Sequence, residues 1–364
     1  MGFQIYEFDT ELKQHINLSE LAWIIVEDDI RNFYISEKKQ SFSGFLNRIF
    51  FNFYQEARAT ISMRYVEMHT KLDSLFSSKE FPRKEGGTAD LYVSKLLEEY
   101  ERTLLEEATS HSKGIGKKFR VNKQNIEVLK ESGSSEYYDD SIGAYMKAVF
   151  EEYVQLPSYQ RELIFFKDTV DKVELALAKK NKLKISLMQK LTPDGQNYYT
   201  KRFYVMPYKI ACDKTGNFNY LIGYAEEIGN EGALGEKRIA SFRISRIEKI
   251  EVMSSMSGFL SKSSKDLVDK ELLSKTPQFL AGELIDIKII FNEKGLESFA
   301  RQIYMRPSSF DKVDKYTYVF HCTEFQAMNY FFKFGRDIEV VAPLSLRENI
   351  KNRYFEAWKN YEKN

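Results

Sequence analysis

Arginine, tyrosine and serine side chains recur at alternating positions in the middle third of the chain. Arg202 and Tyr204 lie two residues apart in one alternating stretch, Ser186 lies in a second, and Arg243 follows Phe242 in a third. Successive side chains of a strand point to opposite faces, so we expect these polar groups on one face and their apolar neighbours on the other. A guanidinium can bind a phosphate through two N–H groups, and a tyrosine ring can stack on a base. These residue types therefore fit a site for a nucleotide or a nucleic acid, and they do not by themselves establish one.

Tyr220 and Arg246 extend this candidate site, and each has a structural alternative. Tyr220 follows a turn in the stretch GNFNYLIGYAEE, and Arg246 lies in SFRISRI. The residue types alone favour a core position for Tyr220, with its hydroxyl hydrogen-bonded. Arg243 and Arg246 could equally form surface ion pairs, for instance with Glu248. Both interpretations stay open on the residues alone.

A second group of basic residues lies in two short alternating stretches of the N-terminal half. Lys13 and His15 are the polar side of LKQHI, and Lys118 and Arg120 are the polar side of KKFRV. If the two stretches pair as antiparallel strands, all four side chains lie on one face of a ribbon. Basic runs are often only solvated faces, so nucleic-acid binding and simple exposure are both open for this ribbon.

The two basic stretches each begin a repeated pattern. INLSELAWI and VNKQNIEVL align Asn17 with Asn122, both expected as helix N-caps. SGFLNRIFFNFY and IGAYMKAVFEEY align Phe51 with Phe150. The order predicts a short strand, a helix, a turn and a longer apolar helix, twice. Neither unit alone could bury its apolar faces, so the two should pack together.

This repeat resembles the ribbon-helix-helix family. The resemblance implies a two-stranded ribbon that enters the major groove of DNA. It also implies phosphate contacts from the backbone at the start of each second helix, at Ser43 and Gly44 and at Ile142 and Gly143. The alternative is a plain helical domain whose segments share only an apolar period.

From about residue 156 the sequence predicts one helix and then four to five strands joined by short turns, a small β-barrel. YVMPY, FNYLIGY and SFRISRIEKI follow one another as in WYL domains, named for a Trp-Tyr-Leu triplet. Here the triplet is Asn219-Tyr220-Leu221, and the family's proline matches Pro207. The resemblance implies an Sm-like β-barrel that senses nucleotide or nucleic-acid ligands. Its binding residues would be Ser186, Arg202, Tyr204, Tyr220, Arg243 and Arg246.

The last hundred residues begin with a polar connector rich in serine and lysine and then alternate strands with helices. This order predicts an α+β layer. The stretch FFKFGRDIEVVAPLSLRENI resembles the extension that follows WYL domains, which implies a homodimer. We therefore expect an α+β multidomain chain, with a ribbon-helix-helix-like domain at 1–155, a WYL domain at 156–255 and a dimerisation domain at 256–364.

Composition narrows the function classes. The 364 residues are 43% hydrophobic and 29% charged with a net charge of +1, as in a soluble protein, and no apolar run could span a membrane. Cys212 and Cys322 are the only cysteines, so we expect no disulfide framework, no metal site, no cofactor and a cytoplasmic location. The four histidines are scattered, and the loop GNEGALGEKR lacks the Lys-Ser/Thr of a phosphate loop. We therefore expect no enzyme, and acidic pairs such as Asp28-Asp29 to serve as caps or surface residues.

In its order of domains and its lysine- and aromatic-rich composition, the chain resembles the WYL accessory proteins of type VI-D CRISPR systems. That resemblance implies binding of single-stranded RNA, possibly DNA, and enhancement of an RNA-guided, RNA-cleaving effector protein. The alternative is a DNA-binding transcriptional regulator whose WYL domain senses a nucleotide or nucleic-acid ligand. A pure protein-interaction module is a third class, and it predicts no nucleic-acid binding.

Overall fold

The chain forms two compact units, 1–167 and 168–364. A computed structural model describes residues 12–34, 41–77, 95–96, 98–99, 114–132, 141–190, 198–213, 218–280 and 283–362. Of the predicted domain boundaries, the one at 255/256 falls inside the second unit. The division into three domains stays a prediction.

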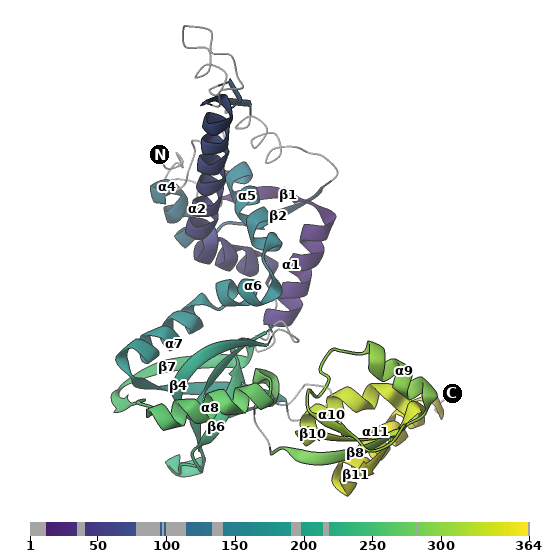
Figure 1. The fold of residues 1–364 in the computed structure, drawn as a ribbon. Helices are drawn as coiled ribbons and strands as arrows, with labels where there is room; N and C mark the ends of the chain where they lie inside the picture. The colour runs from purple at the N-terminus through teal and green to yellow at the C-terminus, as the bar shows by residue number, and fades with distance from the viewer. Residues whose placement is uncertain are drawn as a thin grey trace. The chain divides into compact units, whose positions relative to one another are not determined.

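The first unit holds a two-stranded ribbon and the helices that follow each strand (Figure 1). In chain order its described elements are β1 (Lys13–Leu18), α1 (Glu20–Phe33), α2 (Phe42–Ser77), β2 (Ile115–Arg120), α4 (Lys123–Ser132), α5 (Ile142–Gln155) and α6 (Ser158–Phe165). β1 and β2 pair antiparallel over six residues each. Strand, helix and helix therefore follow one another twice, in the predicted order.

Caps fix where the first helix of each half begins. The Ser19 hydroxyl accepts a hydrogen bond from the amide of Ala22 at 3.2 Å, and the Asn122 side chain accepts one from the amide of Asn125 at 2.9 Å. Asn122 is therefore the N-cap of α4, as predicted. The prediction for Asn17 is wrong, because β1 continues past it and the cap moves to Ser19.

The second helices match in a different register from the predicted one. α5 is capped by Ser141, and the amide of Gly44 near the start of α2 donates to the Ser41 hydroxyl at 3.1 Å. Aligning the two serines places Phe50 opposite Phe150, and both side chains are fully buried. Phe51, which the sequence alignment matched with Phe150, is 38% exposed. The repeat is present, and its predicted alignment in these helices is wrong by one residue.

A buried ionic network lies in the core of the first unit. The carboxylate of Asp29, on α1, accepts hydrogen bonds from Tyr153 Oη at 2.8 Å, from Arg161 Nε at 2.6 Å and from Arg161 Nη2 at 3.0 Å. Asp29 is 1% exposed, so its expected place at a cap or on the surface is wrong. Burial raises the pKa of Asp29, although the hydrogen bond and charge of Arg161 oppose that shift.

The second unit begins with an antiparallel five-stranded sheet in the order β6-β5-β4-β3-β7. Its described elements are α7 (Lys167–Lys179), β3 (Asn181–Lys190), β4 (Tyr198–Asp213), β5 (Phe218–Ile228), β6 (Arg238–Arg243), β7 (Ile247–Ser257) and α8 (Lys262–Ser274). The glycine-containing loop between β5 and β6 is a hairpin loop, as expected.

The five-stranded sheet is not closed, so the prediction of a closed β-barrel is wrong. β6 and β7 are its two edges, and no ladder joins them among the described residues. They are nevertheless consecutive, joined only by the 3-10 turn Ile244–Arg246. At about 2 Å per residue this turn keeps the end of β6 next to the start of β7. The two edges therefore approach each other at that corner, and the sheet is curled but open.

The segment predicted as a polar connector forms α8. Ser261 caps this helix by accepting a hydrogen bond from the amide of Ser264 at 3.2 Å. Val268 and Leu272, four residues apart, face Tyr220 and Ile222 of β5. Figure 1 shows α8 lying across the strands of this sheet.

The rest of the second unit is a four-stranded antiparallel sheet, order β11-β8-β10-β9, with helices packed on it. The predicted alternation of strands and helices is confirmed. The described elements are β8 (Ile285–Phe291), α9 (Glu293–Arg301), β9 (Phe310–Lys312), β10 (Thr317–Cys322), α10 (Glu324–Phe331), β11 (Ile338–Ala342) and α11 (Leu344–Glu362). None of the helices in the described ranges has the length and apolarity needed to cross a membrane.

His321 is expected to make the stability of the sheet β11-β8-β10-β9 depend on pH. Its Nε2 lies 3.0 Å from Asp311 Oδ2 and its Nδ1 lies 2.7 Å from Asp286 Oδ1. These hydrogen bonds, that of Asp311 first, raise the pKa of His321 above 6.5. The stabilisation is fully present below the unfolded pKa of about 6.5 and is lost as pH rises through the folded pKa. We expect urea midpoints to fall over that window in the natural chain and to fall less in His321→Gln. Equal pH dependence in both chains would contradict this prediction.

Candidate nucleic-acid interface

The four predicted ribbon residues lie on one exposed face. Lys13 pairs with Arg120 and His15 pairs with Lys118 across the β1–β2 ladder. All four are exposed, whereas Ile16 and Phe119, which point the other way, are buried. A Cβ on Gly116 would lie 2.4 Å from His15 Cε1, so the imidazole lies over this glycine. The ribbon therefore presents a basic surface about six residues long.

The opposite face holds the ribbon to the helices. Lys117 points inward, with its Nζ 2.6 Å from Glu27 Oε1 and 4.7 Å from the centroid of the Trp23 ring. The Trp23 indole donates a hydrogen bond to the carbonyl of Ile115. Lys117 is thus a structural cation, and only the outward-facing residues remain as candidates for phosphate contacts.

The charge on the ribbon is not distributed evenly. His15 and Lys118 lie the same distance before the caps Ser19 and Asn122, so the local twofold axis of the repeat passes between them. The same axis relates the Lys13–Arg120 pair to the Asn17–Gly116 pair. One end of the ribbon therefore carries two cations and the other end none.

Three of the six predicted residues of the sheet lie together. Ser186 of β3 pairs directly with Arg202 of β4, and Tyr204 lies two residues further along the same face. Arg202 is exposed, and the other two side chains are partly exposed. This part of the predicted site is open to a ligand.

Tyr220 and Arg243 also lie together, and Tyr220 is covered by α8. They are direct partners in the β5–β6 ladder. Tyr220 is 8% exposed and packs with Val268 and Leu280, and the guanidinium carbon of Arg243 lies 3.2 Å from the centroid of the Phe218 ring. Tyr220 therefore belongs to the buried cluster under α8, and Arg243 packs on the Phe218 ring beside it.

An acidic residue of α8 is hydrogen-bonded to the strand β4 of the sheet below it. Asp269 accepts hydrogen bonds from Tyr208 Oη and from Lys209 Nζ, each at 2.7 Å. Neighbours on a regular strand point apart, and the bulge between Pro207 and Lys209 allows both to reach the same carboxylate. The hydrogen bond from Lys209, and then that from Tyr208, lowers the pKa of Asp269. The helix α8, which was not predicted from the sequence, therefore divides the predicted site. The part with Tyr220 is covered, and the part with Arg202 is open.

Arg246 lies at the corner between β6 and β7. It is exposed at the end of the 3-10 turn and is followed at once by β7, whose Lys249 pairs with Ser186. Lys249 is not among the residues predicted from the sequence, although it lies in the stretch SFRISRIEKI. A bulge at Glu248 of β7, opposite Ser186 and Leu187, sets the pairing of Lys249, and alternation within a single strand cannot reveal that.

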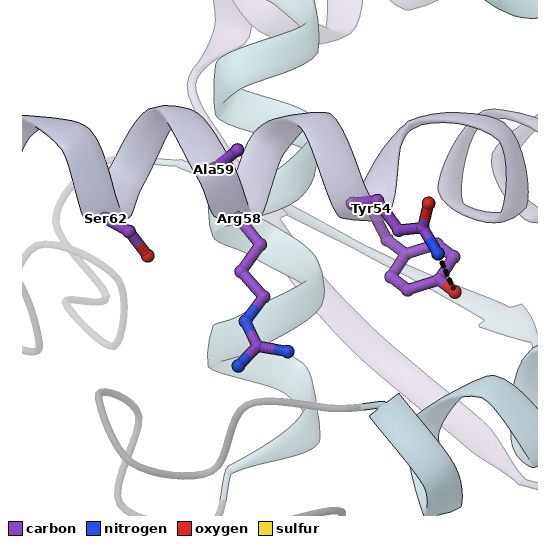
Figure 2. A pocket seen from close by; sticks show the side chains of 5 residues that line it. Tyr54, Arg58, Ala59 and Ser62 are labelled. Atoms are coloured by element: carbon purple, nitrogen blue, oxygen red, sulfur yellow. Dashed lines mark hydrogen bonds between the residues drawn. The ribbon is translucent and has the colours of Figure 1, made fainter.

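A hollow of about 360 Å³ on α2 is a different kind of site. Tyr54, Gln55, Arg58, Ala59 and Ser62 line it, and Gln55 donates to the Tyr54 hydroxyl at 3.0 Å (Figure 2). Burial raises the pKa of nearby Tyr145 to about 12, so that phenol stays protonated near neutral pH. One arginine and two hydroxyls form no acid–base pair. In the described ranges, no group of three or more His, Cys, Asp or Glu residues could hold a metal ion.

Comparison with known proteins gives one informative similarity. No protein-family model matches the chain, and neither does any curated protein. A solved structure described as a crystal structure of a CRISPR Cas-related protein is similar with a TM-score of 0.70 at 20% identity, over 99% of this chain and 97% of that chain. Proteasome accessory factor B/C of Arthrobacter aurescens has a TM-score of 0.21 at 16% identity, over 50% of this chain and 25% of that one, and carries no argument. The first similarity shows a shared fold over almost the whole chain.

Proposed function

We propose that this chain is a non-catalytic CRISPR accessory protein that binds single-stranded RNA and enhances a type VI-D RNA-guided, RNA-cleaving effector. The observation that carries the proposal is the shared fold with a CRISPR Cas-related protein, which extends over both compact units. A similarity confined to one unit would have supported only a shared domain, and not a shared role of the whole chain.

The chemistry of the exposed surfaces supports nucleic acid as the ligand. The open part of the sheet offers Arg202 for phosphate and Tyr204 for stacking. Two copies of strand, helix and helix around a basic ribbon support the ribbon-helix-helix-like assignment of the first unit. Pro207 lies in β4 and Arg243 lies in β6, in the strand order expected from the resemblance to WYL domains, and this order supports the WYL assignment. A homodimer formed through the C-terminal sheet and its helices belongs to the same proposal.

Two measurements test the proposal. Labelled single-stranded RNA is titrated with the full chain at two salt concentrations, and the chain is then added to a type VI-D effector cleaving a reporter RNA. We expect binding that weakens with salt, because cations displace counterions from phosphates, and faster reporter cleavage. Absence of binding at low salt, or an unchanged cleavage rate, would refute the corresponding half of the proposal.

The ribbon favours a second candidate function, a DNA-binding transcriptional regulator. A two-stranded ribbon fits the major groove, and four basic side chains lie on its exposed face. In that case duplex DNA would bind through the ribbon, and the WYL domain would sense a ligand.

A double substitution separates the two candidates. Under our proposal, Lys118→Ala with Arg120→Ala changes the affinity for single-stranded RNA less than about twofold, since the sheet makes the main contacts. Under the alternative, the same variant weakens duplex binding and reduces the salt slope on duplex DNA by about 1.8, or 0.9 per lost phosphate contact. The matched control is Lys117→Ala, which removes an inward-facing lysine of the same strand.

A further inference from the structure

The part of the sheet face that α8 leaves open contains a row of residues from three neighbouring strands. Lys249 of β7 pairs with Ser186 of β3, and Ser186 pairs with Arg202 of β4. Directly paired residues point to the same face, so the two cations flank the serine. Strands lie about 4.8 Å apart, which places Lys249 about 10 Å from Arg202.

Arg202 and Lys249 of this row, and the neighbouring Arg246, differ from three other cations of the sheet in having no ionic partner among the described residues. Lys182 is paired with Glu226 at 2.8 Å, Lys201 with Glu227 at 3.0 Å and Lys209 with Asp269 at 2.7 Å. Arg202, Arg246 and Lys249 form no hydrogen bond or ion pair through their side chains within the described ranges, and all three are exposed. The surface pair of Arg246 with Glu248 that the sequence allows is not formed.

Acidic residues mark the limit of this row on one side. In the next row along the strands, Glu251 pairs with Lys184 and Glu226 pairs with Tyr204. Opposite charges directly across a ladder compensate each other, so Lys184 contributes little net charge. On the other side the strand leads to the corner that carries Arg246. Among the described side chains on this face, Arg202 and Lys249 therefore flank Ser186 without an acid directly across the ladder, and Arg246 lies at the adjoining corner.

We propose that Arg202, Ser186, Lys249 and Arg246 form the phosphate track for single-stranded nucleic acid, with Tyr204 beside it as the stacking surface. Lys249 is a binding residue in this track. Tyr220 packs under α8 and Arg243 packs on Phe218, so these two residues do not contact the ligand. This inference rests on the proposed function, because it specifies how the sheet binds the strand. A polyanion whose bases are accessible fits both parts of the surface, whereas a duplex hides its bases from Tyr204.

Salt titration counts the contacts. Each phosphate contact contributes about 0.7 to the slope of log affinity against log salt for a single strand. We expect Arg202→Ala, Arg246→Ala and Lys249→Ala each to lower the slope by about 0.7, and the triple variant by about 2. Tyr204→Leu should weaken binding without changing the slope. The matched control is Lys201→Ala, which removes a paired lysine next to Arg202 on the opposite face.

A second measurement does not depend on variants. The natural chain is acetylated with and without an unstructured single-stranded RNA, and lysine labelling is read by mass spectrometry. Lys249 should be protected, and Lys294 on α9, which is exposed and remote in sequence, should not.

The outcomes separate the inference from the proposed function. If the natural chain binds single-stranded RNA while the triple variant keeps its slope and Lys249 stays unprotected, the track is refuted and the proposed function stands. If the natural chain binds no single-stranded RNA, both are refuted. Equal binding of blunt duplex RNA, with an equal loss in the triple variant, would also overturn the single-strand assignment.

Discussion

Replacing Asp29 by alanine is expected to lower the free energy of unfolding of the first unit by about 3–5 kcal/mol. The carboxylate is 1% exposed and is held by both Arg161 and Tyr153. Its removal leaves the guanidinium of Arg161, whose side chain is 11% exposed, without a counterion in a desolvated site. The cost of that uncompensated charge, and not the net strength of the pair, gives the prediction its size.

Urea unfolding followed by fluorescence measures this effect. The chain has two tryptophans, Trp23 in the first unit and Trp358 in the second, so Trp358→Phe leaves a reporter specific to the first unit. The matched control is Asp28→Ala, which removes an adjacent carboxylate whose side chain is 53% exposed. It should cost at most about 1 kcal/mol. A similar loss for both aspartates would contradict the buried network.

The second large effect concerns two neighbouring phenylalanines of α2. Phe50→Ala is expected to destabilise the first unit by about 3–5 kcal/mol, because it opens a cavity in a closed core. The Phe50 ring is fully buried and packs edge-on against Tyr145 of α5, with 5.9 Å between ring centroids. Phe51→Ala removes the same atoms from a side chain that is 38% exposed, and it should cost about 1 kcal/mol or less.

Urea unfolding in the same Trp358→Phe background measures the effects of Phe50→Ala and Phe51→Ala. Because the two variants differ only in which face of one helix loses a ring, the difference between them reports the register of the repeat directly. If Phe51→Ala proved the more harmful, the alignment of Phe51 with Phe150 would be correct, and the helix face assigned here would be wrong.

Most elements of the chain were predictable because they depend on local patterns. Alternation predicted β1, β2 and the strands of both sheets except the short β9, and apolar residues at helical spacing predicted the long helices. The sequence placed Lys13, His15, Lys118 and Arg120 on one ribbon face, because alternation fixes the face of a strand once its partner is known. The wrong helix register has a local cause, since IFFNF offers adjacent phenylalanines to the same alignment.

The rest depends on contacts that a single stretch does not contain. α8 looked like a connector because only Val268 and Leu272 face inward from a helix rich in serine and lysine. The burial of Asp29 depends on Arg161, more than a hundred residues away in the chain. The pairing of Lys249 with Ser186 depends on a bulge at Glu248 of β7, which appears only in the ladder with β3. The openness of the sheet depends on how two edge strands meet, which turn lengths alone do not decide.

The uneven ribbon has a consequence for where an anionic strand binds. When two identical chains build a ribbon, both ends must be equal, and such proteins favour palindromic targets. Here both halves belong to one chain, so selection could change one end without the other: Lys13 and Arg120 occupy one end, Asn17 and Gly116 the other. An anionic strand lying along this surface is therefore attracted more strongly to the end with Lys13 and Arg120, and is not centred on the twofold axis of the repeat. The ribbon has a polarity.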